Sequence, residues 1–221
     1  MKKVLYLGTD KTFSLERCEV MHYPVILLIP KTLQDENVKS CLKRLPLFSH
    51  CFLTSKNAVE ILFTLSLDAL ESLRGKCISI GPATTLALQK RGITPLWEAK
   101  LASQEGMIEE MQKHSWKNAY IFYPRSSLAR SCLSLYLDQA KIAYEALDLY
   151  DTVCQAPQPI PSLEDIEEII FTSPSTVEGF FRIFSEVPNG KKIRLQGPVT
   201  EEAFYRISLK NKFLPECKTL K

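Results

Sequence analysis

Short apolar runs alternate along this chain with longer segments in which apolar residues recur at helical spacing. The apolar runs predict strands at residues 3–7, 25–29, 50–54, 77–80, 93–97, 119–123, 168–172 and 192–196. The intervening segments predict helices at 34–44, 56–65, 82–91, 103–114, 126–139, 173–185 and 198–208. Because strands that are apolar throughout are separated by helices, the pattern predicts an α/β fold whose parallel sheets are covered on both faces.

One phrase occurs twice. LTSKNAVEILF begins at Leu53 and FTSPSTVEGFF at Phe171, and they share Thr-Ser, Val-Glu and a closing Phe at the same offsets. Each is followed, after a similar interval, by a strand and a Gly-Pro-x-Thr sequence, at 81–84 and at 197–200. Two shared phrases in the same order indicate one supersecondary unit used twice, and hence two similar domains.

The boundaries of these domains are inferred from a proline-rich segment and from the first strand–helix unit, which is too small to form a domain alone. Residues 155–165 hold three prolines without periodicity, as linkers do. We therefore expect residues 1–28 and 155–221 to form one lobe and residues 33–148 to form a second lobe inserted into it. The linkers at 29–32 and 149–154 would lie in two connecting strands, YPVILLIP and ALDLYDTV, that run side by side. Two successive domains divided near residue 155 are the alternative.

Each repeated phrase is expected to end a strand and to begin a helix. Ser173 is suited to the N-cap and Pro174 to the first helical position, while Gly81 and Gly197 would occupy the equivalent cap positions. Four helix N-termini would then lie at the carboxyl ends of parallel strands, where open α/β sheets bind ligands. Their unpaired N–H groups suit a carboxylate or phosphate. The alternative is that these residues only cap helices; four copies favour an anion site between the two lobes.

Charge and composition narrow the classes of function. The chain has 221 residues, a hydrophobic fraction of 45% and a net charge of +3, which is too weak to indicate a nucleic-acid-binding protein. His22, His50 and His114 are far apart in the sequence, and none of the eight glycines falls in a G-x-G-x-x-G motif. Neither a metal site nor a nucleotide cofactor is therefore predicted.

The cellular setting is predicted from the cysteines and from the apolar runs. The seven cysteines are scattered without a C-x-x-C pair, as expected for reduced thiols in a cytoplasmic protein. The opening MKKVLYLGTDK has too short an apolar run for a signal peptide. The longest apolar stretch, residues 25–29, is too short to cross a bilayer, so we expect no membrane association.

With these segments assembled, the chain resembles the uroporphyrinogen-III synthase family. The resemblance is carried, in order, by LTSKNAVEIL, GKCISIGPATTLALQKRGITP, ASQEGMIEEM, AYIFYPRSSLARSCLSLYLDQAKIAYEALDLYDT, FTSPSTVEGFF and GPVTEEA. It implies two similar Rossmann- or flavodoxin-like parallel-sheet lobes, one inserted in the other and joined by two strands. It also implies an enzyme that acts without a cofactor on hydroxymethylbilane, a linear tetrapyrrole with eight carboxylates. We expect a monomer that cyclises this substrate with inversion of ring D and loss of water.

The resemblance also implies site residues. Tyr150, in the Tyr-x-Thr at the second connecting strand, is implied to assist departure of the substrate hydroxyl; a role as a wall of the cleft is the alternative. Arg130 is implied to steer carboxylates, unless it lies on a solvated helix face. The remaining substrate-binding candidates are Ser55, Lys56, Gly81 and Thr84 in the inserted lobe, with Ser173, Gly197, Val199 and Thr200 in the other. We expect the Thr84 and Thr200 hydroxyls to face the same opening.

The sequence departs from the family pattern at three places, and two other classes of function are alternatives. Gly8 and Thr9 stand where the family often has Thr-Arg, Val199 replaces a common threonine, and the tail 213–221 is too short for the final helix of many members. A two-lobed protein that binds a polycarboxylate or tetrapyrrole without turning it over is the alternative function. A flavodoxin-like regulator would need an acidic pocket or a Gly-rich loop, and the sequence has neither.

Overall fold

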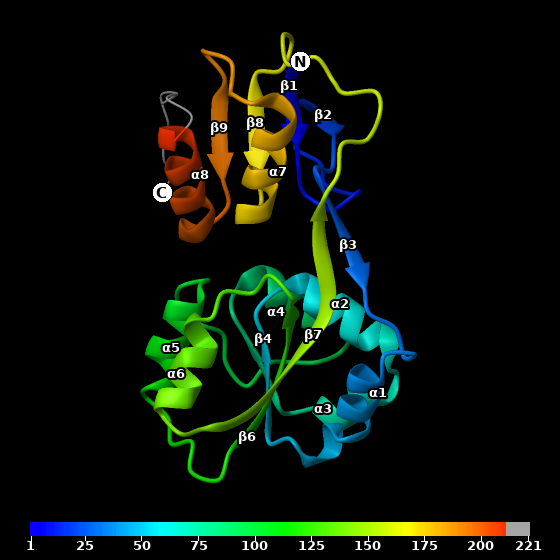
Figure 1. Cartoon of the computed structure of the whole chain (residues 1–221), viewed down its shortest axis with the longest axis vertical. Coiled ribbons are helices and arrows are strands. Elements are labelled where there is room, and N and C mark those ends of the chain that lie inside the picture. The colour runs from blue at the N-terminus through cyan, green and yellow to red at the C-terminus, as the bar shows by residue number, and fades with distance from the viewer. Residues whose placement is uncertain (211–221) are drawn as a thin grey trace. The chain divides into compact units, whose positions relative to one another are not determined.

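The computed structural model describes residues 1–210, which form two compact units. Unit 1 contains Met1–Leu28 together with the chain from Thr152 onward, and unit 2 contains Ile29–Asp151. Both units contain helices and strands, drawn as coiled ribbons and arrows in Figure 1. The tail at 213–221, for which the sequence predicted no helix, lies outside the described residues.

Unit 1 is built on a four-stranded sheet in the order β2-β1-β8-β9. The strands are β1 (Lys2–Tyr6), β2 (Cys18–His22), β8 (Glu168–Phe171) and β9 (Lys192–Leu195), and β1 pairs in parallel with β2 and β8 while β8 pairs in parallel with β9. Helices α7 (Pro174–Phe184) and α8 (Pro198–Lys210) follow β8 and β9. In unit 1, FTSPSTVEGFF and the Gly-Pro-x-Thr sequence at 197–200 therefore follow neighbouring strands, β8 and β9.

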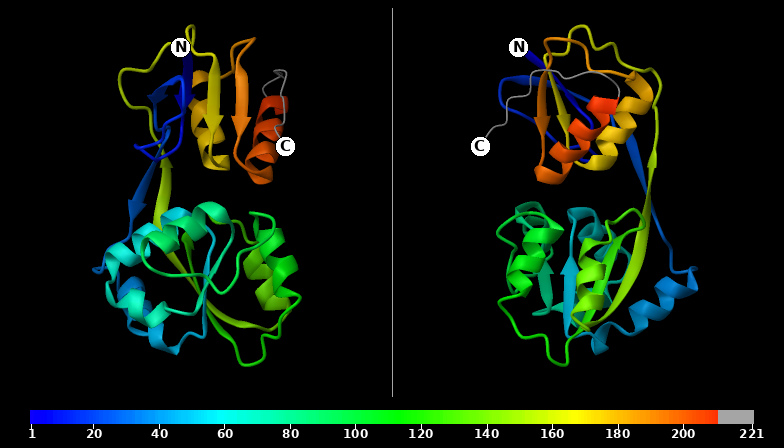
Figure 2. Two further views of the ribbon diagram at one scale, coloured as in Figure 1. Left: turned by 180° about the vertical axis from the view of Figure 1, so that it is seen from behind. Right: turned by 60° about the vertical axis from the view of Figure 1, so that its left-hand side comes forward.

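The two faces of this sheet are covered differently. Leu5, Ile169, Phe171 and Ile193 form a core with Phe180 and other residues of α7 and α8. Both helices lie on this one side, as the two views of Figure 2 agree. On the opposite face Phe13, from the connection between β1 and β2, stacks on Tyr6 at 4.0 Å between ring centroids. The expectation of helices on both faces is therefore wrong for unit 1, because the short connection after β1 forms no helix.

A buried carboxylate at the start of β8 pairs with cations from the two neighbouring strands. The Glu168 side chain is fully buried and accepts hydrogen bonds from Lys2 Nζ at 2.5 Å and from Arg194 Nε at 2.8 Å. Burial alone would raise the pKa of this carboxyl, but the two cations outweigh it and hold the pKa below its usual range. Lys2 and Glu168 begin their strands, at the edge opposite the strand ends that lead into α7 and α8, and we assign the three charges a structural role.

Unit 2 is built on a five-stranded sheet in the order β3-β7-β6-β4-β5. Its strands are β3 (Ile26–Pro30), β4 (His50–Leu53), β5 (Cys77–Ser79), β6 (Tyr120–Ser126) and β7 (Ala143–Cys154). The pairs β4–β5, β4–β6 and β6–β7 are parallel. The two predicted connecting strands correspond to β3 and β7, which lie next to each other in the sheet.

Helices cover both faces of the unit 2 sheet. On one face α5 (Gln104–Met111) and α6 (Cys132–Gln139) pack Met107, Met111, Leu133 and Leu137 against Phe52 and Ile121. On the other face Phe48 stacks on Phe122, next to α1 (Glu36–Lys43) and a short 3-10 turn (Leu45–Leu47). Helices α2 (Lys56–Leu65), α3 (Asp68–Leu73) and α4 (Pro82–Lys90) complete this layer.

Several predicted elements differ in the structure. Residues 93–97 do not form a strand; Pro95 has no N–H to offer a ladder, and only a single bridge, Ser79–Glu98, forms beside β5. The helix predicted from residue 126 begins at Cys132, because β6 continues to Ser126 and a turn follows. Strand β2 and helix α3 were not predicted, since CEVMH alternates polar and apolar residues and DALESL is only six residues long.

At Gly179, helix α7 packs so closely against the backbone of Val25 that a larger residue would not fit. A Cβ at this position would lie 2.7 Å from the carbonyl oxygen of Val25. We expect Gly179→Ala to lower the free energy of unfolding by about 1–3 kcal/mol through overpacking, although alanine favours a helix. Urea unfolding would measure this, with Glu178→Ala on the same helix as the control. A stabilised Gly179→Ala variant would contradict this packing.

Candidate functional site

In unit 2 the first helix start of the repeat is capped by Ser55. This residue follows β4 in an extended conformation, and its Oγ accepts a hydrogen bond from the Ala58 N–H at 3.0 Å. Helix α2 therefore begins at Lys56 with one of its unpaired N–H groups satisfied by the cap. Ser55 and Lys56 are half-buried, at the carboxyl end of β4.

The structure brings Ser55 together with Tyr150. The Ser55 Oγ and the Tyr150 Oη lie 3.0 Å apart, within hydrogen-bonding distance. Tyr150 lies on β7 and is only 4% exposed. Burial raises the pKa of its phenol above the ordinary value, although the contact with Ser55 opposes this shift. The phenol therefore holds its proton at neutral pH.

The second helix start in unit 2 lies after β5. Gly81 precedes Pro82, the first residue of α4, and a Cβ on Gly81 would lie 2.7 Å from the Cβ of Ala102. Glycine is therefore needed here for close approach of the segment that leads into α5. Thr84 lies in the first turn of α4 and is buried, being 2% exposed.

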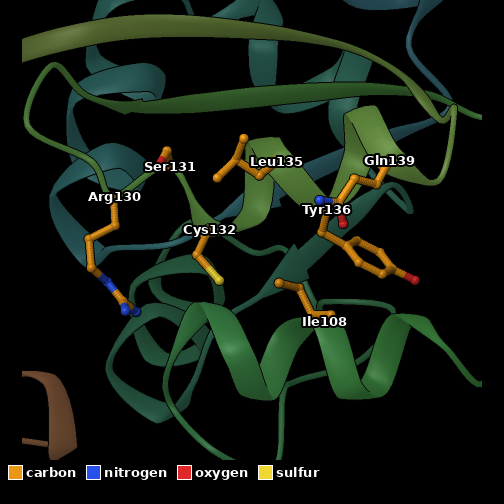
Figure 3. A pocket seen from close by; sticks show the side chains of 7 residues that line it. All are labelled: Ile108, Arg130, Ser131, Cys132, Leu135, Tyr136 and Gln139. Carbon is orange, nitrogen blue, oxygen red and sulfur yellow. The ribbon is translucent and has the colours of Figure 1, made fainter.

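Arg130 is engaged by a carboxylate of the neighbouring helix. Its Nη1 and Nη2 donate to the two carboxylate oxygens of Glu105 at 2.6 and 2.9 Å. The hydrogen bond from Arg130 is the largest cause that lowers the pKa of Glu105, to about 2. Arg130 lines an open hollow of about 710 Å³ between α5 and α6, into which Cys132 and Ile108 also project (Figure 3).

A buried amide next to Glu105 connects three elements and was not predicted as a site residue. Gln104 Nε2 donates to the Tyr123 hydroxyl at 3.1 Å, and its Oε1 accepts from the Leu133 N–H at 3.0 Å. Gln104 thereby holds the start of α6 against β6, next to the turn that carries Arg130. One signal for its place is Ser103, a capping residue type, which caps α5 and so puts Gln104 in the first helical turn.

In unit 1 the first helix start is capped by Ser173. Its Oγ accepts from the Thr176 N–H at 3.3 Å, and the Thr176 hydroxyl accepts from the Ser173 N–H at 3.1 Å, which completes a capping box. Pro174 occupies the first turn. The Ser173 Oγ lies 3.0 Å from the Ser175 Oγ, whereas the Ser55 Oγ contacts the Tyr150 phenol.

The second helix start in unit 1 depends on backbone conformation. Gly197 has a φ of 83°, in the left-handed region that favours glycine, and Pro198 begins α8. The Thr200 hydroxyl donates to the Gln196 carbonyl at 2.8 Å, at the end of its own strand. At Val199 and Thr200, therefore, backbone N–H groups are the donors available to a ligand.

Among residues 1–210, no group of three or more His, Cys, Asp or Glu residues is arranged to hold a metal ion. Within the same residues, none of the helices combines the length and the apolar character needed to cross a membrane.

Comparison with known proteins identifies the family. The family model described as uroporphyrinogen-III synthase HemD matches residues 11–221. The chain belongs to the uroporphyrinogen-III synthase family. Among solved structures, the uroporphyrinogen-III synthetase of Helicobacter pylori aligns with a TM-score of 0.68 at 17% identity, over 98% of this chain and 92% of that one. The expected fold of two α/β lobes is thereby confirmed.

Sequence relatives carry related names. The uroporphyrinogen-III synthase of Chlorobaculum parvum is 24% identical over 188 residues, which cover 76% of this chain and 74% of that protein. The porphyrin biosynthesis protein HemD of Ruminiclostridium josui is 23% identical over 179 residues, or 77% of this chain. This chain spans only 35% of the length of the latter protein.

The Glu105–Arg130 pair predicts a pH-dependent contribution to stability. Because its folded pKa is depressed to about 2, Glu105 stabilises the fold above its ordinary pKa, and this contribution is lost as the pH falls from 4.5 toward 2. Its side chain is 50% exposed, so screening limits the contribution to about 0.2–1 kcal/mol. Urea unfolding at pH 7 should show Glu105→Gln less stable than wild type, and the difference should shrink at pH 3. Glu109→Gln on the same helix is the control; an equal loss there would contradict the assignment.

Proposed function

We propose that this chain cyclises hydroxymethylbilane to uroporphyrinogen III, with inversion of ring D and loss of water. The observation that carries this proposal is the Ser55–Tyr150 hydrogen bond at the start of α2, in a chain of the uroporphyrinogen-III synthase family. It joins a proton-bearing phenol to a helix N-terminus at the carboxyl end of a parallel strand. The alternative of a binding protein without activity is not favoured by the family relationship.

Substrate binding is proposed to depend on the four helix starts. The substrate carries eight carboxylates, and each helix N-terminus offers N–H groups and a partial positive charge to an anion. Ser55 and Gly81 precede the two helix starts in unit 2, and Ser173 and Gly197 precede those in unit 1. The first turns of these helices contain the other candidates, Lys56, Thr84, Val199 and Thr200. Arg130 would attract carboxylates while it is paired with Glu105.

The reaction needs positioning more than it needs a nucleophile. Departure of the terminal hydroxyl gives an azafulvene, the substituted carbon of ring D attacks it, and a spiro intermediate fragments and closes with ring D inverted. Holding a flexible chain in one geometry lowers the entropic part of the barrier. The Ser55–Tyr150 pair would assist the first step by donating to the oxygen that leaves.

The setting of this activity is also a proposal. We infer a monomer that acts in the cytoplasm on a small molecule, without a nucleic-acid or membrane partner. The weak net charge of +3 and the free, buried thiols of Cys41, Cys51 and Cys77 support this setting.

The isomer of the product tests the proposed activity. Purified protein given fresh hydroxymethylbilane should yield the type III ring, because ring inversion requires the substrate to be held during closure. Chromatography of the oxidised product separates type III from type I, the product of spontaneous closure. If only type I forms at the rate seen without protein, the proposed activity is wrong.

The α8 helix start predicts that backbone geometry matters more than the hydroxyl. Gly197→Ala forces a side chain into the left-handed region, which costs about 1–2 kcal/mol and displaces the N–H groups that follow. We expect it to raise KM several-fold. Thr200→Val keeps the N–H and removes only a hydroxyl that donates to Gln196, so KM should change less than after Gly197→Ala. Steady-state kinetics would measure both, and the reverse order would place the hydroxyl against the substrate.

A further inference from the structure

The hydrogen bonds at Ser55 leave one of its bonding positions to be assigned. A serine hydroxyl can accept two hydrogen bonds and donate one. The Ala58 N–H already donates to the Ser55 Oγ at 3.0 Å, which occupies one acceptor position. The contact with the Tyr150 Oη at 3.0 Å must use either the second acceptor position or the single proton of Ser55.

The burial of Tyr150 decides between these two arrangements. Tyr150 is 4% exposed, whereas Ser55 is half-buried. Among residues 1–210, no hydrogen-bond partner other than Ser55 is present for the Tyr150 hydroxyl. If Ser55 donated to Tyr150, the phenol proton would be left buried without an acceptor, which is unfavourable. An arrangement in which Tyr150 donates to Ser55 satisfies the buried phenol and leaves the Ser55 proton for another acceptor.

We propose that the Ser55 hydroxyl is the donor that contacts the leaving oxygen of the tetrapyrrole, and that Tyr150 is a positioning residue that acts through Ser55. This inference rests on the proposed function and reverses the roles implied by the family resemblance, in which Tyr150 is the donor and Ser55 only binds. Ser55 is the more accessible member of the pair and lies at the helix start.

The repeated phrase supplies an internal comparison. Ser173 stands at the matching position in unit 1 and caps α7 in the same manner, through Thr176. Its Oγ contacts the small hydroxyl of Ser175 and not a buried phenol. Helix capping therefore needs no tyrosine, and the tyrosine beside Ser55 requires an explanation beyond capping.

The proposed step balances in protons and electrons. As the carbon–oxygen bond of the substrate breaks, its electron pair leaves with the oxygen, and the Ser55 proton moves to that oxygen to form water. The Tyr150 proton moves to Ser55, so the phenolate faces a cationic azafulvene. When ring D closes, the pyrrole carbon loses a proton, which returns through Ser55 to Tyr150. No oxidant or second substrate is needed.

Steady-state kinetics of the full chain with hydroxymethylbilane test this order. Ser55→Ala should lower kcat by about 10²-fold, the size of a general-acid contribution. Tyr150→Phe should lower kcat by about tenfold with little change in KM, because Ser55 then loses the hydrogen bond that orients it and that resupplies its proton. The double variant should be no slower than Ser55→Ala, since Tyr150 acts through Ser55. Ser55→Thr, which keeps the hydroxyl, should recover most of the lost kcat.

Controls separate this inference from loss of the cap and from failure of the proposed function. Asp35 caps α1 by accepting from the Asn37 and Val38 N–H groups, so Asp35→Ala removes a cap of the same unit away from the pair. It should leave kcat unchanged. A Tyr150→Phe loss equal to or larger than that of Ser55→Ala, or losses that multiply in the double variant, would overturn the inference while wild type still forms type III. Formation of type I alone by wild type would instead overturn the proposed function.

Discussion

The proposed function depends on unpaired backbone N–H groups at the starts of helices that follow parallel strands. A parallel strand that leads into a helix aims the first turn of that helix at the carboxyl edge of the sheet, where the N–H groups have no partners within the helix. Ser55 and Ser173 satisfy one such group each and leave the rest of the turn to a ligand. Both copies of the phrase form this arrangement, one in each unit.

The fold could be predicted largely from the sequence because burial and capping act locally. Apolar strands such as EIIF and capping serines carry their signals within a few residues, and α2 and α7 begin where those signals place them. The face opposite α7 and α8 could not be predicted, because it depends on whether the connection after β1 forms a helix. That connection instead covers the sheet with Phe13 stacked on Tyr6.

The candidate site was predictable in its residue types and less so in its contacts. Gly197 was expected at a helix start, and its positive φ gives the physical reason for glycine there. The contact between Ser55 and Tyr150 joins residues far apart in sequence, so only the pairing of the strands brings it about. Likewise, neither local pattern nor spacing shows that Gln104 is buried or that Glu105 meets Arg130.

Under the proposed function, backbone amides at the helix starts of unit 1 and of unit 2 bind carboxylates of the tetrapyrrole. Amide-resolved NMR of the labelled chain during titration with uroporphyrin III, a stable analogue of the product, tests it most directly. The largest shift changes are expected at residues 56–58 and 83–85 in unit 2 and at 175–177 and 199–201 in unit 1, with saturation at each helix start. Saturable shifts confined to one unit, or located away from the helix starts, would contradict it.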